Sequence, residues 1–258
     1  MNKYYDFEQI EGLLSIVLFG SKARGEEDDF SDVDIFLLVE DIPQDRIEEI
    51  IDILKSKLLF DNIRISLYQI STYKQLLLEG SMFIWHLKLE GRIIYKKSNI
   101  NLYNNLVPFT KFQYNLSLYK KLYINAKASL KANGMNEFDL SQLFFICRNV
   151  CLLTCFKLSY PTFGRISVYD KLLEIIGVLP LSRENYILLS RWRLSYTRAI
   201  DLNLNFPTGV NMLKILAEID NLFTLSREII ESGGQNVGKI TKHEDILEKI
   251  EKRQNFSI

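Results

Sequence analysis

The chain has 258 residues, of which 47% are hydrophobic and 25% charged, so its composition is that of an ordinary globular protein with one large core or two modest ones. Its 32 basic and 32 acidic residues cancel to a formal net charge of zero, which excludes a general electrostatic attraction to nucleic acid or to an anionic membrane. Any site for a polyanion must therefore be local.

Three cysteines, Cys147, Cys151 and Cys155, recur at every fourth position of an apolar run. This spacing stacks them on one helix face and predicts reduced core residues, with metal or redox chemistry as the less favoured alternative. The residues after Met1 lack the apolar segment of a signal peptide, and no uninterrupted apolar run reaches the roughly 18 residues of a membrane helix. We expect a cytoplasmic protein that does not bind membranes.

The amino-terminal part alternates strand and helix patterns. The apolar run 13–19 ends at Gly20 and predicts a buried strand, and a second strand is predicted over 33–39. The next predicted elements are a helix over 43–60, a half-buried strand over 63–70, a helix over 72–89 and a strand over 91–95. This order predicts an α/β domain.

From about residue 101 onward, apolar residues recur with helical spacing. The predicted helices cover 102–132, 139–158, 167–177, 183–201 and 209–231, followed by a short charged helix over 242–253. Short connections that contain Gly or Pro separate most of them, as in a helical bundle. The change of pattern at 96–101 divides the chain into an α/β domain over 1–98 and an all-α bundle over 99–258.

The segment that follows the first strand has the residues of a phosphate-binding turn. Gly20 lets the backbone approach a phosphate closely, and the N–H groups at the start of a helical turn point at the anion together with the Ser21 hydroxyl. Lys22 and Arg24 add positive charge at the rim, and Gly25 lets the chain turn away. A Gly-Ser turn by itself is usually only a turn.

Two carboxylates begin the second strand. Asp32 and Asp34 are two residues apart, so their side chains project from the same face of the strand, with Val33 turned toward the core. Mg²⁺ is commonly held by one or two carboxylates, with water and nucleotide phosphates as the other ligands. The pair therefore predicts a site for Mg²⁺ or Mn²⁺, although such a pair alone is more often a strand start or a cap.

Taken in order, the two motifs resemble the signature of the DNA polymerase beta-like nucleotidyltransferase superfamily. The sequence Gly-Ser-x-Ala-Arg-Gly occupies 20–25, and Ser-Asp-x-Asp-Ile occupies 31–35. The resemblance covers about residues 13–95. It implies a small mixed sheet whose first strand ends at the Gly-Ser turn and whose second strand carries the carboxylate pair.

The resemblance also implies roles for these residues. Gly20 and Ser21 would hold the β- and γ-phosphates, and Asp32 and Asp34 would be the catalytic metal ligands that orient the α-phosphate. The expected reaction is Mg²⁺-dependent transfer of a nucleoside monophosphate from an NTP, with ATP expected, to a hydroxyl of RNA, protein or a small molecule bound between the two domains.

One part of the family pattern is missing. Active members carry a third carboxylate on the next strand, where this chain has Arg64, Ser66 and Tyr68 on the face away from the core. Asp61, or a glutamate of the helical half, is an alternative source of the acid. A second hypothesis is therefore a nucleotide-binding pseudoenzyme that acts through protein association in a toxin–antitoxin or defence module. A non-catalytic RNA-binding module is the least favoured, because the net charge is zero.

The helical half resembles the bundles of kanamycin-type nucleotidyltransferases and the HEPN domains that accompany minimal nucleotidyltransferases. HEPN ribonucleases combine an Arg and a polar residue with a His shortly afterwards. Arg148 and Asn149 begin such a motif, but the only histidines are His86 and His243, so ribonuclease activity is not expected.

Three further residues are candidates for contacts with the acceptor or the phosphates: Ser66, Arg191 and Arg198. The two arginines are seven residues apart and share a helix face, which is either a basic wall of the site or, as we favour, a solvated face. A protein partner or a homodimer remains an open alternative, and nucleic acid enters only as an acceptor.

Overall fold

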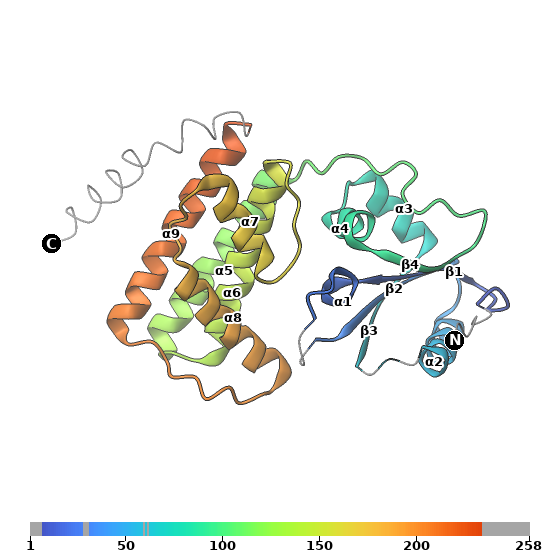
Figure 1. The fold of residues 1–258 in the computed structure, drawn as a ribbon, viewed down its shortest axis with the longest axis horizontal. Coiled ribbons are helices and arrows are strands. Elements are labelled where there is room, and N and C mark those ends of the chain that lie inside the picture. Colours follow the sequence, from blue (N-terminus) through green and yellow to red (C-terminus); the bar gives the residue numbers. More distant parts are fainter. Residues whose placement is uncertain (1–6, 28–30, 59, 61, 234–258) are drawn as a thin grey trace. The chain divides into compact units, whose positions relative to one another are not determined.

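The structure is a computed structural model with two compact units, Met1–Thr110 and Lys111–Ile258 (Figure 1). It describes residues 7–27, 31–58, 60 and 62–233, so the helix predicted over 242–253 lies outside the described residues. The division after Thr110 falls later in the chain than the change of sequence pattern at 96–101. The intervening segment packs with the first unit, because Leu102 is buried in the core formed by its sheet and helices.

The described part of the first unit contains one four-stranded mixed sheet with the strand order β3-β2-β1-β4. The strands are β1 (Leu13–Phe19), β2 (Val33–Val39), β3 (Ile63–Gln69) and β4 (Arg92–Lys96). β1 is antiparallel to β2 and to β4, whereas β2 is parallel to β3. The four predicted strands and the small mixed sheet are confirmed.

The helices of the first unit are α1 (Gly20–Arg24), α2 (Gln44–Lys57), α3 (Ile70–Leu78) and α4 (Met82–Glu90). The single helix predicted over 72–89 is wrong. Gly80 breaks it, with a φ of +64° that places its backbone in the left-handed region. A Cβ at this position would lie 2.5 Å from the carbonyl oxygen of Pro108. Glycine at position 80 therefore also allows the segment that contains Pro108 to approach the backbone closely.

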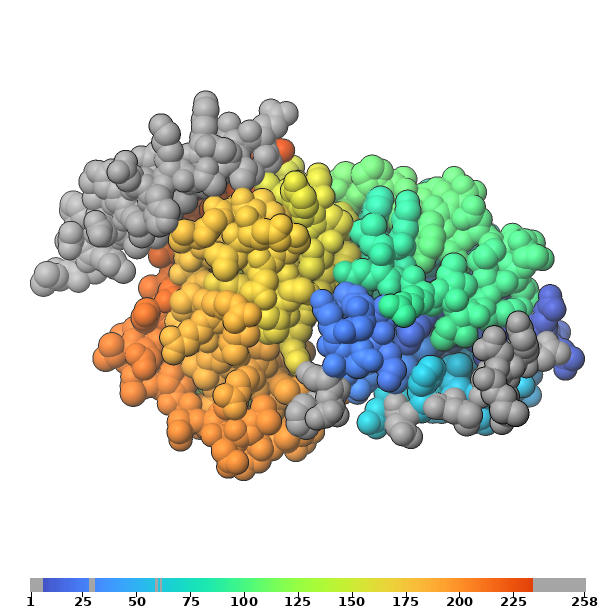
Figure 2. All heavy atoms as spheres, in the orientation of Figure 1, coloured from blue at the N-terminus to red at the C-terminus, as the bar shows by residue number. Residues whose placement is uncertain are grey.

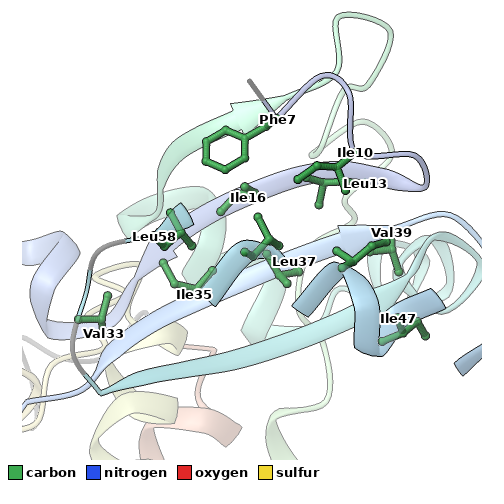
Figure 3. Packing of buried hydrophobic residues seen from close by; sticks show 12 residues of the cluster. Phe7, Ile10, Leu13, Ile16, Val33, Ile35, Leu37, Val39, Ile47 and Leu58 are labelled. Carbon is green, nitrogen blue, oxygen red and sulfur yellow. The ribbon is translucent and has the colours of Figure 1, made fainter. Parts of the chain in front are cut away.

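Helices cover both faces of the sheet, α2 on one side and α3 with α4 on the other (Figure 1). Figure 3 shows the layer toward α2, where Ile16 of β1 and Leu37 of β2 belong to the same buried cluster as Ile47 of α2. On the opposite face, the Tyr68 ring of β3 lies 5.7 Å from that of Phe83. The expectation that this face of β3 is free of the core is therefore wrong, because α4 packs on it.

The second unit is a helical bundle, as predicted. Its described helices are α5 (Phe112–Asn133), α6 (Glu137–Lys157), α7 (Ser167–Ile176), α8 (Arg183–Arg198) and α9 (Gly209–Glu231). α5 starts ten residues later than the helix predicted over 102–132. The preceding residues include Asn105, whose φ lies in the left-handed region, and Pro108, which has no backbone N–H to donate. Neither residue continues a helix.

α6 is the central helix of the bundle and packs against α5, α7, α8 and α9 (Figure 1). Its three cysteines are buried and free, as the sequence predicts for reduced core residues. Among the described residues, α6 is the one helix with the length and hydropathy of a membrane span. Of its most apolar window, 72% is buried inside the protein, which is typical of a core helix.

Candidate active site

The turn after β1 lies directly against the second carboxylate of β2. α1 begins at Gly20, immediately after the last residue of β1, and Gly20 has a φ of +76°. A Cβ on this residue would lie 2.3 Å from Asp34 Oδ2. Only glycine therefore permits both the backbone conformation and the close approach, which places the predicted phosphate turn beside the predicted metal ligand.

The sheet register places both carboxylates on the same face. Asp34 is paired with Phe19 of β1 on one side and with Arg64 of β3 on the other. Asp32 precedes Asp34 by two residues, while Val33 between them is buried in the core toward α2. The two aspartates thus stand at the start of β2, where β1 ends.

A cation occupies the position where the resemblance expects a third acid. Arg64 Nη2 lies 3.1 Å from Asp32 Oδ2, and the side chain of Asp32 is 14% exposed against 64% for Arg64. Ser66 follows on the same face of β3 and is partly buried beside Phe36. Asp61, the alternative acid, lies outside the described residues.

The donor set suits a hard divalent cation that brings other ligands with it. In the part of the chain that the structure describes, no group of three or more His, Cys, Asp or Glu residues could hold a metal ion. Asp32 and Asp34 together provide two carboxylates, and Mg²⁺ typically binds to one or two of them with substrate phosphates and water. The residues therefore fit a metal that arrives with a nucleotide.

Part of the chain matches a known protein family. Residues 6–100 match the family model described as polymerase beta, nucleotidyltransferase. This part of the first unit is therefore similar to a nucleotidyltransferase domain. Among solved structures, the chain is similar to the spectinomycin adenyltransferase of Enterococcus faecialis, crystallised with ATP and spectinomycin, at 14% identity and a TM-score of 0.45 over 84% of this chain and 92% of that chain. No curated protein matches the chain.

Within the first unit, Arg24 connects α1 to α4. Its Nε donates to Glu26 Oε2 and its Nη1 donates to Glu90 Oε2, both at 2.8 Å. Figure 2 shows the surfaces of α1 (blue) and α4 (blue-green) side by side. Two carboxylates thus engage the Arg24 guanidinium and give it a structural role, while its contribution of charge to the phosphate rim remains a prediction.

Glu90 is the centre of this partly buried cluster. His86 Nε2 lies 3.1 Å from Glu90 Oε2, and the side chains of Glu90 and His86 are each 14% exposed. Burial raises the pKa of Glu90, but hydrogen bonding and charge from His86 and Arg24 outweigh it and lower the pKa below the usual value. The four-residue spacing of His86 and Glu90 on a helix was the available sequence signal for this pair.

Lys22 lies on α1 and is partly buried. Its Nζ lies 6.0 Å from the centroid of the Phe60 ring, near the limit of a cation–π contact. Its contact with phosphate, like that of Ser21, remains a prediction.

The arginines of the bundle belong to the second unit. Arg191 is exposed and Arg198 is partly buried, both on α8, and their contact with the acceptor or phosphates remains a prediction. Arg193 donates to Ser141 Oγ at 3.1 Å. Arg148, from the incomplete HEPN-like motif, donates to the carbonyl of Phe163 and so holds the segment before α7 against α6.

Proposed function

We propose that the nucleotidyltransferase domain transfers a nucleoside monophosphate from an NTP, with ATP expected, to a hydroxyl of an acceptor. The observation that carries the proposal is the contact between Gly20 and Asp34, which joins a turn suited to phosphate with a carboxylate pair suited to Mg²⁺ or Mn²⁺. Each motif alone is common, but their juxtaposition at the end of β1 favours one site for a nucleotide and its metal.

In the proposed reaction, some residues of this site bind the nucleotide and others orient it. The first amides of α1 have no partners inside the helix, so those around Ser21 donate to the triphosphate together with the Ser21 hydroxyl. A divalent cation, when bound, neutralises charge on the phosphates. Asp32 and Asp34 would hold this cation and would thereby help to orient the α-phosphate for attack by the acceptor hydroxyl.

Proton removal is the weak step of the proposed reaction. The residue of β3 beside Asp34 is Arg64, whose guanidinium stays charged and cannot accept a proton. A positioned general base typically contributes about 10²- to 10⁴-fold in rate. We therefore expect turnover to be slow and to increase with pH when the acceptor hydroxyl ionises.

Transfer of label tests the proposal directly. The full chain is incubated with α-labelled ATP, GTP, CTP or UTP, with Mg²⁺ or Mn²⁺, and with RNA, protein and polyhydroxylated small-molecule acceptors. We expect label on an acceptor, loss of transfer in Asp34→Asn, and no change in Asp52→Asn, which neutralises an exposed aspartate of α2. Absence of transfer from every NTP, with nucleotide still bound, contradicts the proposal.

A nucleotide-binding pseudoenzyme of a toxin–antitoxin or defence module is the second candidate. The ion pair between Arg64 and Asp32 favours it, because a cation stands where an active family member has an acid. This candidate predicts ATP binding without transfer of label, and a change of molar mass in light scattering when ATP and a protein partner are both present. The pseudoenzyme candidate is excluded if the wild type transfers label and Asp34→Asn does not.

A further inference from the structure

The start of β2 already binds a cation that belongs to the chain. Arg64 Nη2 lies 3.1 Å from Asp32 Oδ2, and Arg64 is in register with Asp34 across the parallel pair β2–β3. Both carboxylates and the guanidinium therefore project from the same face of the sheet. The formal charges of Asp32, Asp34 and Arg64 sum to −1, whereas a divalent cation carries a charge of +2.

A divalent cation on Asp32 cannot coexist with Arg64 in this position at low cost. The Asp32 side chain is mostly buried, whereas that of Arg64 is largely exposed. The guanidinium is thus free to swing into solvent, while the carboxylate stays in place. Two cations sharing one carboxylate repel each other at contact distance, even with solvent screening.

We propose that Arg64 competes with the divalent cation for Asp32 and so sets the metal affinity of the site. Without nucleotide, Arg64 holds Asp32 and metal binds weakly. The phosphates of a nucleotide add the negative charge that favours the metal over the guanidinium, so metal and nucleotide bind together. Arg64 is a positioning residue in this scheme. The inference rests on the proposed function in one respect, namely that Asp32 and Asp34 hold the metal.

The test is a titration of the full chain with Mn²⁺ alone, followed by electron paramagnetic resonance at low ionic strength. We expect Arg64→Ala to bind Mn²⁺ about three- to tenfold more tightly than the wild type, because a competing exposed charge is removed. Arg64→Lys keeps the charge and should stay within about twofold of the wild type. Added salt should narrow the difference between Arg64→Ala and the wild type.

A matched control separates the local effect from net charge. Arg46→Ala removes one positive charge from the same domain, on α2, where Arg46 pairs with Glu49, and should leave Mn²⁺ affinity unchanged. The inference is overturned if Arg64→Ala binds Mn²⁺ no more tightly than the wild type does. It is also overturned if Arg46→Ala gains as much Mn²⁺ affinity as Arg64→Ala.

Two further variants show which idea has failed. Asp32→Asn and Asp34→Asn should each abolish the Mn²⁺ binding that the wild type shows in this titration. If they do, and Arg64→Ala brings no gain, the competition is wrong and the metal site of the proposed function stands. If both asparagine variants bind Mn²⁺ as the wild type does, the metal site itself is wrong, and the inference fails with it.

Discussion

Replacing Gly20 with alanine tests whether the turn and Asp34 form one unit. The φ of +76° puts an alanine in the left-handed region, which costs about 1–2 kcal/mol. Its Cβ would also lie 2.3 Å from Asp34 Oδ2, so the carboxylate must rotate or the turn must move. Forced repacking of this kind typically costs about 1–3 kcal/mol. We therefore expect Gly20→Ala to lose about 2–5 kcal/mol of unfolding free energy and to bind Mn²⁺ more weakly.

Gly25 at the end of α1 provides the matched control. Its φ is +72°, but no atom of the described residues lies within 4 Å of the position that a Cβ would occupy. Gly25→Ala should therefore lose only the backbone part, about 1–2 kcal/mol, and keep its Mn²⁺ affinity. Urea unfolding followed by circular dichroism gives both free energies. Equal losses in the two variants, with unchanged Mn²⁺ binding, would refute the dependence of Asp34 on Gly20.

Glu90→Gln should cost about 1–3 kcal/mol in urea unfolding, because it removes the charge that holds Arg24 and His86. Because folding lowers the pKa of Glu90, the ionised carboxylate stabilises the folded state fully above its unfolded pKa of about 4.3. This stabilisation is lost as the pH falls through the folded pKa, so the melting curves of the wild type and the variant should converge at low pH. The three thiols should not react with a disulfide reagent until the chain unfolds, because burial raises their pKa values, that of Cys155 to about 12; a fast native reaction contradicts this. Tyr123→Phe should cost about 1 kcal/mol through the lost hydrogen bond to the Leu216 carbonyl, whereas Tyr114→Phe at an exposed position should cost nothing measurable.

The strands were predictable from sequence because each is an apolar or alternating run bounded by a local turn. The helix breaks were less accessible. Gly80 is compatible with a helix by pattern, and only its close approach to Pro108 shows why the chain turns there. The start of α5 was misplaced for a similar reason, since apolar residues before Phe112 pack in the first unit without forming a helix.

The candidate site shows the same division between local and distant information. Gly20, Asp32 and Asp34 could be predicted as site residues from residue type and spacing, because they lie in one turn and at the start of one strand. The partners of these residues depend on pairings between distant segments. Arg24 and Glu90 are 66 residues apart, and Arg64 reaches Asp32 only through the parallel register of β2 and β3. Composition and periodicity carry no information about either pairing.

The register of Arg64 also decides between the two candidate functions. Neighbouring strands lie about 4.8 Å apart, so Arg64→Asp places a carboxylate beside that of Asp34 on the same face. If the missing acid alone limits an active enzyme, this variant should bind Mn²⁺ more than about tenfold more tightly than Arg64→Ala and should transfer label about 10²-fold faster than the wild type. A pseudoenzyme would gain the affinity and still transfer nothing, because the metal site alone cannot supply an acceptor site. If Mn²⁺ affinity does not exceed that of Arg64→Ala, the carboxylate does not reach the metal, and the argument from strand register is wrong.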